Sequence, residues 1–225
     1  MSKFLSTFLF VAIATVAFSQ SKAVYVNPKF YSLARDHKKI AVVPFTVQLG
    51  LRPKEREKLS NEQFMEMQKN EGLAAQSALV SWFLKKQNAQ DYDLQFQDVK
   101  TTNALLIKAG MDISNLAAYT PDELAKVLGV DAVMGGMVKT SKPLSDGASI
   151  AMGALIGFYG STNAGNISIT LNDAAEGDLL WKYDNDLSGS LGSDMDAIMD
   201  ALMRRAAKKF PYADMENLKK QEQKK

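Results

Sequence analysis

The chain has 225 residues, of which 46% are hydrophobic and 23% are charged, so it is long enough to fold as one domain with a substantial core. Its formal net charge of +2 comes from 27 basic and 25 acidic residues and provides no long-range field for nucleic acid or anionic lipid. The sequence contains no cysteine and one histidine, which excludes disulfides and thiol nucleophiles and makes a catalytic triad or a multi-histidine zinc site hard to assemble. We therefore expect a protein that binds and assembles rather than an enzyme, with no cofactor, no metal, no small-molecule substrate and no nucleic acid partner.

Residues 1–19 have the pattern of a secretory signal peptide. A short basic start is followed by an apolar run over residues 4–18, and the small residue Ser19 suits cleavage directly before Gln20. The alternative is a single membrane anchor, but the run is shorter than the roughly 20 residues that a membrane-spanning helix needs. The sequence offers no cysteine for lipid attachment at the new amino terminus. It predicts an exported protein, periplasmic or extracellular, with association at the outer membrane left open.

The mature chain divides into three parts. Residues 20–37 are expected to be an amino-terminal extension, with a strand-like stretch at 24–26 and a turn, outside the core. Residues 38–212 are expected to form a single α/β domain, and the polar residues 213–225 a disordered tail. No internal repeat and no domain linker is visible.

The domain is predicted to begin with a buried strand over residues 40–45, which Pro44 ends or makes irregular. A solvated loop is expected at residues 46–59. Ser60 and a glutamine three residues later form a capping box that opens a long amphipathic helix, in which Gly72 could cause a kink or a break. A second strand over residues 93–99 and a short helix over about 103–109 are expected to follow.

The clearest helix signal lies at Thr120. A proline follows at the first helical position, Glu123 can close a capping box, and Gly129 can end the helix. A strand over residues 130–138 comes next, and the adjacent glycines Gly135 and Gly136 indicate a bulge or a close backbone approach.

Alternating residues predict an antiparallel hairpin near the end of the domain. Apolar and polar residues alternate over 166–171, a turn lies at Glu176 and Gly177, and residues 179–183 supply the partner strand. Ser193 is expected to begin a closing helix. The element order predicts an α/β sandwich of two or three layers, with a mixed parallel and antiparallel sheet.

Several motifs resemble one family of bacterial envelope proteins. They are KKIAVVPF at 38–45, YTPDELAKVLGVDAVMGGMV at 119–138 and NISITLNDAAEGDLLWKYD at 166–184. These stretches are similar to a domain shared by the TolB amino-terminal region, the curli secretion channel subunit and small lipoproteins that activate penicillin-binding proteins. The resemblance covers residues 38–210 and implies a TolB-N-terminal-like (anticodon-binding-like) topology, no catalytic residues, and a function through protein contacts or oligomerisation.

Residues 146–165 are the most unusual stretch of the mature chain, because they are apolar and carry no charge after Asp146. Gly153 and Gly157 are spaced as Gly-x-x-x-Gly, which permits close helix approach, and the apolar run is too short to span a bilayer as a helix. Three alternatives are open for this segment: it folds against its own sheet, it forms a self or partner interface, or it contacts membrane. The candidate interface residues are Ile150, Met152, Gly153, Leu155, Ile156, Gly157, Phe158 and Tyr159.

Other candidate sites have weaker signals. Residues 184–189 resemble the start of a calcium loop but lack its final glutamate, so a strand end and a turn is the favoured interpretation. His37, between two charged residues, is expected at the surface. A hydrolase using carboxylates such as Asp131 and Asp173 would require a raised carboxylate pKa in a cleft.

The sequence thus predicts an exported, non-enzymatic envelope protein that acts as an assembly, scaffolding or secretion-apparatus factor. Its contacts are expected to involve the sheet edge and residues 146–165, with an envelope protein or a second copy as partner. The alternative is a membrane-inserted oligomeric secretion or pore component that uses the same segment.

Overall fold

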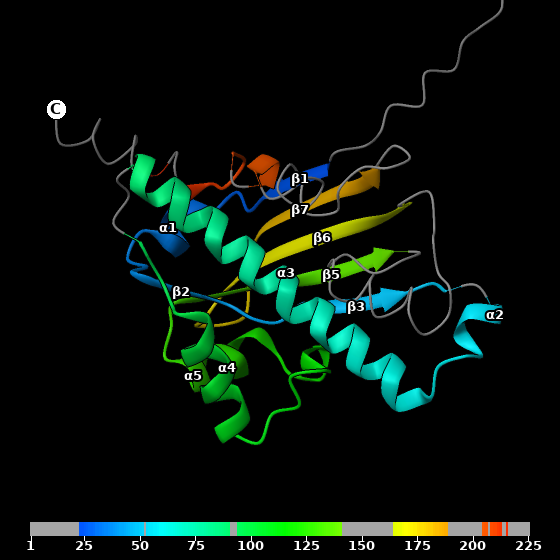
Figure 1. The fold of residues 1–225 in the computed structure, drawn as a ribbon. Helices are drawn as coiled ribbons and strands as arrows, with labels where there is room; N and C mark the ends of the chain where they lie inside the picture. Colours follow the sequence, from blue (N-terminus) through cyan, green and yellow to red (C-terminus); the bar gives the residue numbers. More distant parts are fainter. Residues whose placement is uncertain are drawn as a thin grey trace, which may run out of the picture.

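A computed structural model describes residues 23–51, 53–90, 94–140, 164–188, 204–206, 208–212 and 215 of the chain. The fold is α/β, built around a seven-stranded mixed sheet with helices on both faces (Figure 1). The predicted fold class is therefore confirmed. The signal peptide, the residues 146–163 that contain the candidate interface, and the start of the closing helix lie outside the described residues.

The sheet has the strand order β1-β7-β6-β5-β2-β4, and β3 also pairs with β5. The strands are β1 (Ala23–Val26), β2 (Lys39–Val42), β3 (Thr46–Leu49), β4 (Gln95–Phe96), β5 (Ala132–Thr140), β6 (Ala164–Asp173) and β7 (Leu179–Ser188). Strands β2, β3 and β4 make parallel pairs, whereas β5, β6, β7 and β1 pair antiparallel with one another. The predicted hairpin is confirmed and extends to Ser188.

The helices are α1 (Phe30–Ala34), α2 (Pro53–Arg56), α3 (Asn61–Gln90), α4 (Val99–Lys108) and α5 (Pro121–Leu128), with a short 3-10 helix η1 (Leu116–Ala118). Three of them begin at caps that the sequence encodes locally. The backbone N–H of Ser60 donates to Gln63 Oε1 at 2.9 Å before α3, that of Thr120 donates to Glu123 Oε2 at 2.8 Å before α5, and that of Thr101 donates to the Asp98 side chain at 3.0 Å in α4.

Pro44 lies between two strands that pair with β5 one after the other. Strand β2 ends at Val42 and β3 begins at Thr46, and both pair with β5, the first through Val42 and Met134 and the second through Thr46 and Met137. The irregular edge expected at Pro44 is confirmed, since proline cannot donate to a ladder. The prediction of a loop over 46–59 is wrong at its start, because β3 contributes buried side chains to the core.

Helix α3 is continuous through Gly72, so the kink or break suggested for this glycine does not occur. Gly72 instead marks a close approach between the helix and the connection that follows β2. A Cβ atom at this position would lie 2.2 Å from the carbonyl oxygen of Phe45, and the Phe45 N–H donates to the Gly72 carbonyl at 3.2 Å.

Two further expectations are corrected. Residues 24–34 contribute more than a lead-in, since β1 pairs with β7 and Phe30 and Ala34 of α1 are buried in the core. The strand expected over 93–99 shortens to β4, because Asp98 caps α4, which begins earlier than expected.

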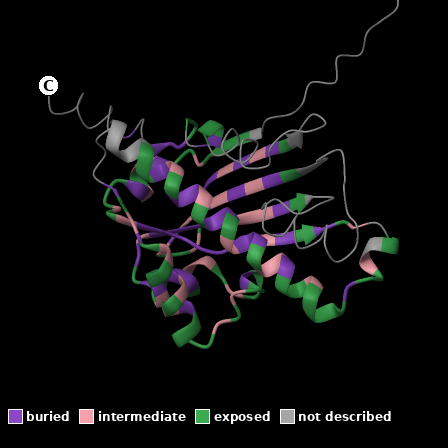
Figure 2. Ribbon diagram, viewed as in Figure 1, coloured by how far each residue is buried: buried purple, intermediate pink, exposed green. Residues whose placement is uncertain are grey.

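The core lies on both faces of the sheet, and its two parts are unequal. Helix α3 crosses one face with its buried side toward the strands, together with α1 and residues around Phe210 (Figure 2). A smaller cluster on the other face joins β2 and β5 to α4, η1 and α5. The molecule therefore has three layers where α4 and α5 cover the sheet and two layers over the rest.

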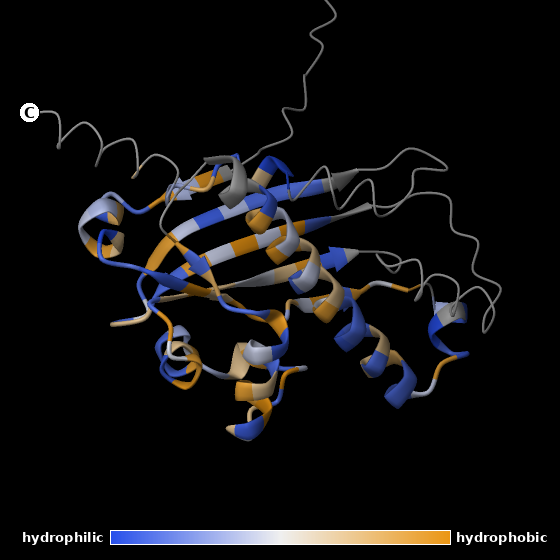
Figure 3. Cartoon of the chain, turned by 60° about the vertical axis from the view of Figure 1, so that its left-hand side comes forward, coloured by the Kyte–Doolittle hydropathy of each residue, from blue (hydrophilic) through white to orange (hydrophobic). Residues whose placement is uncertain are grey.

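Hydrophobic and hydrophilic residues alternate along the central strands (Figure 3). On β6, Ile167, Ile169 and Leu171 are buried beneath α3, so the residues between them face away from that helix. These polar residues of β6 lie on the face opposite α3, in the half that no other described residue covers.

Candidate binding face

The part of the sheet opposite α3 that no other described residue covers carries a cross-strand row of four aligned residues. Gly135 of β5 pairs with Thr170 of β6, Thr170 with Lys182 of β7, and Lys182 with Tyr25 of β1. Directly paired residues project to the same face of a sheet. The row therefore runs from the centre of the sheet to the β1 edge, and we call this surface the open face.

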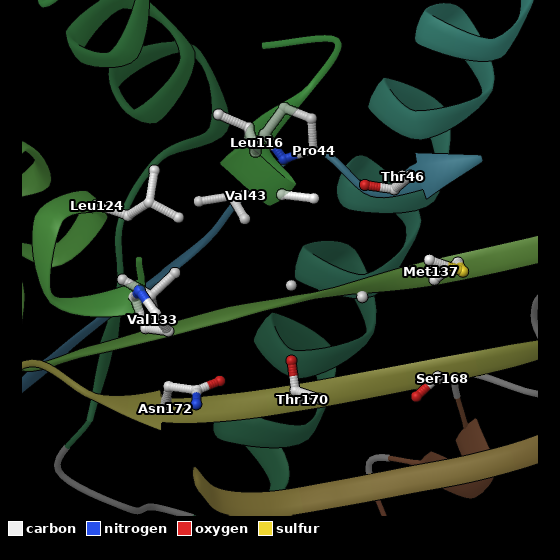
Figure 4. A pocket seen from close by; sticks show the side chains of 14 residues that line it. Val43, Pro44, Thr46, Leu116, Leu124, Val133, Met137, Ser168, Thr170 and Asn172 are labelled. Atoms are coloured by element: carbon white, nitrogen blue, oxygen red, sulfur yellow. The ribbon is translucent and has the colours of Figure 1, made fainter. Parts of the chain in front are cut away.

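A cleft of about 280 Å³ lies where the open face meets η1 and α5. Figure 4 shows Val43, Leu116 and Leu124 gathered on one side of it, and Ser168, Thr170 and Asn172 spaced along β6 on the other. The full lining is Val43, Pro44, Thr46, Leu116, Ala117, Pro121, Leu124, Val133, Gly135, Gly136, Met137, Ser168, Thr170 and Asn172. None of these side chains is ionisable.

The two adjacent glycines of β5 project to opposite faces and have different reasons to be glycine. A Cβ atom on Gly135 would come within 2.9 Å of Val43 Cγ2, on the cleft side. A Cβ atom on Gly136 would come within 2.1 Å of the Ser168 carbonyl oxygen and 2.7 Å of the Phe45 ring. The close approach that the sequence indicated is thus present at both positions, and no register shift occurs there in the ladder with β6.

The β1 edge of the sheet exposes apolar side chains. Val24, Tyr25 and Val26 are 40–43% exposed, although all three lie in a paired strand. An edge strand with apolar side chains and no proline or charge within it offers free backbone groups to another chain. This edge adjoins the open face, and Met65, Leu84 and Ile107 on the helices are exposed apolar side chains elsewhere.

The titratable groups that the sequence made candidates for catalysis serve the structure instead. Asp131 Oδ2 accepts hydrogen bonds from the backbone N–H groups of Lys38 and Lys39 at 2.7 and 2.8 Å. Asp173 Oδ2 accepts from the Ala175 N–H at 2.8 Å. Both carboxylates therefore fasten loop backbone at one end of the sheet.

His37 lies inside the molecule rather than at the surface, which corrects the sequence expectation. Its side chain is 8% exposed, with Nε2 2.9 Å from Asp173 Oδ1 and Nδ1 2.6 Å from the Tyr212 hydroxyl. Since an ionised carboxylate only accepts, Nε2 carries the proton toward Asp173, and the Tyr212 hydroxyl can donate to Nδ1.

The third member of this network is also buried. Tyr212 is 5% exposed, and its burial, reinforced by the nearby negative charges of Asp173 and Asp131, raises the pKa of its hydroxyl above the ordinary value for tyrosine. A buried phenol held in its neutral form has no access to a substrate. The Asp173–His37–Tyr212 network therefore ties the segment around Tyr212 to β6 and to the loop before β2.

The calcium interpretation of residues 184–189 is not supported at its described positions, which belong to β7. Asn185 is buried, whereas its neighbour Asp184 is half-buried on the opposite face and pairs with Lys182 at 3.0 Å. Across the described part of the chain, no three acidic or histidine side chains are grouped so that they could hold a metal ion. Within that same part, no helix has both the length and the apolar character needed to cross a membrane.

The chain was compared with known proteins. No protein-family model and no curated protein matches it. Among solved structures, it is similar to the PelC dodecamer from Paraburkholderia phytofirmans at 12% identity and a TM-score of 0.41, covering 85% of this chain and 96% of that one. It is also similar to lipoprotein GNA1162 from Neisseria meningitidis at 13% identity and a TM-score of 0.40, covering 76% and 98%. A third similar structure is the LpoB C-terminal domain from Salmonella enterica, at 10% identity and a TM-score of 0.36, covering 72% and 94%.

Proposed function

We propose that this chain is an exported, non-enzymatic envelope protein that acts as an assembly, scaffolding or secretion-apparatus factor through protein contacts. The observation that carries the proposal is the open face, where a neutral cleft and an apolar sheet edge lie at the two ends of one row of paired residues. Catalysis would require ionisable groups facing such a cleft, and its lining contains none.

The surroundings of the open face support binding rather than structural filling. Helices α4 and α5 cover the sheet at one end only, and their apolar cluster stops at Val43 and Val133. Beyond it, Ser168 and Thr170 are half-buried, and neither hydroxyl bonds to another described residue. Neutral polar groups beside apolar ones can supply both hydrogen bonds and apolar contact area to a protein partner.

The export part of the proposal rests on residues 1–19, and the family resemblance rests on the motifs at 38–45, 119–138 and 166–184. Residues 150–159 complete the proposal as a second contact segment. In the sequence they lie between β5 and β6, whose ends meet at the paired residues Thr140 and Gly165.

Site-specific photo-crosslinking in intact cells tests the proposal. The photoreactive residue p-benzoyl-phenylalanine replaces Tyr25 or Lys182 on the open face, or Lys100 as a control, which is exposed on α4. We expect the chain in the envelope fraction and a crosslink to one envelope protein, or to a second copy, from Tyr25 and Lys182 but not from Lys100.

Two results would overturn the proposal. A chain retained in the cytoplasm would refute the export, and the same crosslinks from all three positions, or none from any, would refute the open face as a contact surface. Separately, Gly153→Leu and Gly157→Leu are expected to weaken self-association or partner capture. If neither contact changes, residues 150–159 are not part of the interface.

A further inference from the structure

The chemistry of the cleft restricts what part of a partner can enter it. All of its lining side chains are uncharged. A charged group placed there would lose its hydration without gaining an opposite charge, which is strongly unfavourable. The bound portion of the partner is therefore neutral.

One wall of the cleft has the repeat of an extended polypeptide. Ser168, Thr170 and Asn172 occupy alternate positions of β6 and project to the same side. Alternate residues of a strand lie about 6.8 Å apart, which is also the two-residue repeat of an extended peptide. The wall can thus offer one polar group to every second backbone amide of a peptide that runs along it.

The polar groups on this wall can form further hydrogen bonds. The hydroxyls of Ser168 and Thr170 form no hydrogen bond with another described residue. Asn172 uses its Nδ2 to donate to the Gly177 carbonyl at 3.0 Å, and this bond fixes its side chain and leaves Oδ1 as an acceptor.

The opposite wall and the floor suit an apolar side chain. Leu116 and Leu124 are buried, and Val43 closes the cleft beside Gly135. Val43 packs directly over Gly135, because a Cβ atom there would come within 2.9 Å of Val43 Cγ2. The volume of about 280 Å³ accommodates one side chain together with its backbone.

We propose that the cleft binds an extended, uncharged segment of the partner protein, with one apolar side chain against Val43 and Leu124 and backbone amides hydrogen-bonded to Ser168 and Thr170. This inference rests on the proposed function, because it names how the open face recognises its partner. The β6 wall sets the direction of the peptide, and the apolar surface of Val43 and Leu124 selects one side chain.

The test uses the chain from Gln20 and the peptide acetyl-Ser-Val-Phe-Val-Ser-amide as probe, followed by nuclear magnetic resonance of backbone amides and methyl groups. We expect saturable shifts at Gly135, Thr170 and Leu124. A probe with aspartate in place of phenylalanine, and one with N-methylated amides, are each expected to bind at least about tenfold more weakly, which corresponds to about 1.4 kcal/mol.

Two arginine variants provide the matched comparison. Thr170→Arg places a charge inside the cleft, whereas Asn166→Arg places it on the same face of the same strand outside the lining. We expect the first to lose binding and the second to keep it. Thr170→Val, which preserves shape, is expected to reduce affinity without altering the fold, as judged from the unchanged spectrum.

The proposal is overturned if the shifts do not saturate, if they lie elsewhere, or if the aspartate probe binds equally well. Its failure is distinguishable from that of the proposed function. Crosslinks from Tyr25 and Lys182 without peptide binding would leave a protein partner on the open face and remove the extended-peptide mode. Absence of the crosslinks would remove the open face itself as a contact surface.

Discussion

Replacing Gly72 by alanine is expected to destabilise the protein, although alanine is the better helix former. The new Cβ would lie 2.2 Å from the Phe45 carbonyl oxygen, which is a backbone atom and cannot rotate away. Helix α3 must therefore move off the sheet, and the hydrogen bond from the Phe45 N–H to the Gly72 carbonyl is strained or lost.

The magnitude follows from three contributions. Overpacking costs about 1–3 kcal/mol, the strained hydrogen bond costs about 1 kcal/mol, and the helix propensity of alanine returns about 1 kcal/mol. We expect Gly72→Ala to lower the free energy of unfolding by about 1–3 kcal/mol, near the upper end because the blocking atom belongs to the backbone.

Urea unfolding of the chain from Gln20, followed by circular dichroism and tryptophan fluorescence, measures this change. Ala74→Gly on the exposed side of α3 is the control and should cost about 1 kcal/mol from propensity alone. If Gly72→Ala instead stabilises the protein by the amount that this control loses, α3 does not contact the Phe45 backbone and the reasoning is refuted.

Three further predictions concern the buried network and the segment outside the described residues. His37→Ala should lower the free energy of unfolding by about 2–4 kcal/mol in urea, because it leaves Asp173 and Tyr212 without their shared partner, and the exposed neighbour Asp36 changed to alanine should have little effect. Burial raises the pKa of Tyr212 in the folded state, so its contribution to the free energy of unfolding is fully present below pH 10 and declines as the pH rises further. Tyr212→Phe should therefore reduce the loss of stability at alkaline pH. Equal slopes of unfolding free energy against pH for the two proteins would contradict this. Deleting residues 147–164 should reduce the assembly mass measured by light scattering while neither chain floats with liposomes; flotation of the intact chain alone would instead favour the membrane-inserted alternative.

The elements that the sequence predicted best are those whose signals are local. Helix α5 was predicted from Thr120, Pro121 and Glu123, and the alternation of β6 identified its buried face without knowledge of what covers it. The effect of Gly72 was misjudged because helix propensity describes an isolated helix. A glycine is needed at this position because the Phe45 carbonyl, in the connection after β2, lies against it.

The network and the cleft could not be predicted because they depend on distant residues. His37 meets Asp173 136 positions later and Tyr212 175 positions later, and no sequence spacing encodes these contacts. The alternating polar residues of β6 indicated an uncovered face. They did not indicate a cleft, which arises because α5 and η1 cover only part of that face.

The pairing of β1 with β7 has a consequence for how the chain acquires its structure. The first described strand pairs with the last one along the chain, and Val26 lies opposite Trp181. Contacts between segments so distant in sequence form slowly, because loop-closure entropy is lost before they contribute. Because synthesis proceeds from the amino terminus, β1 has no partner in the sheet until β7 has been made, and the sheet cannot be completed before then.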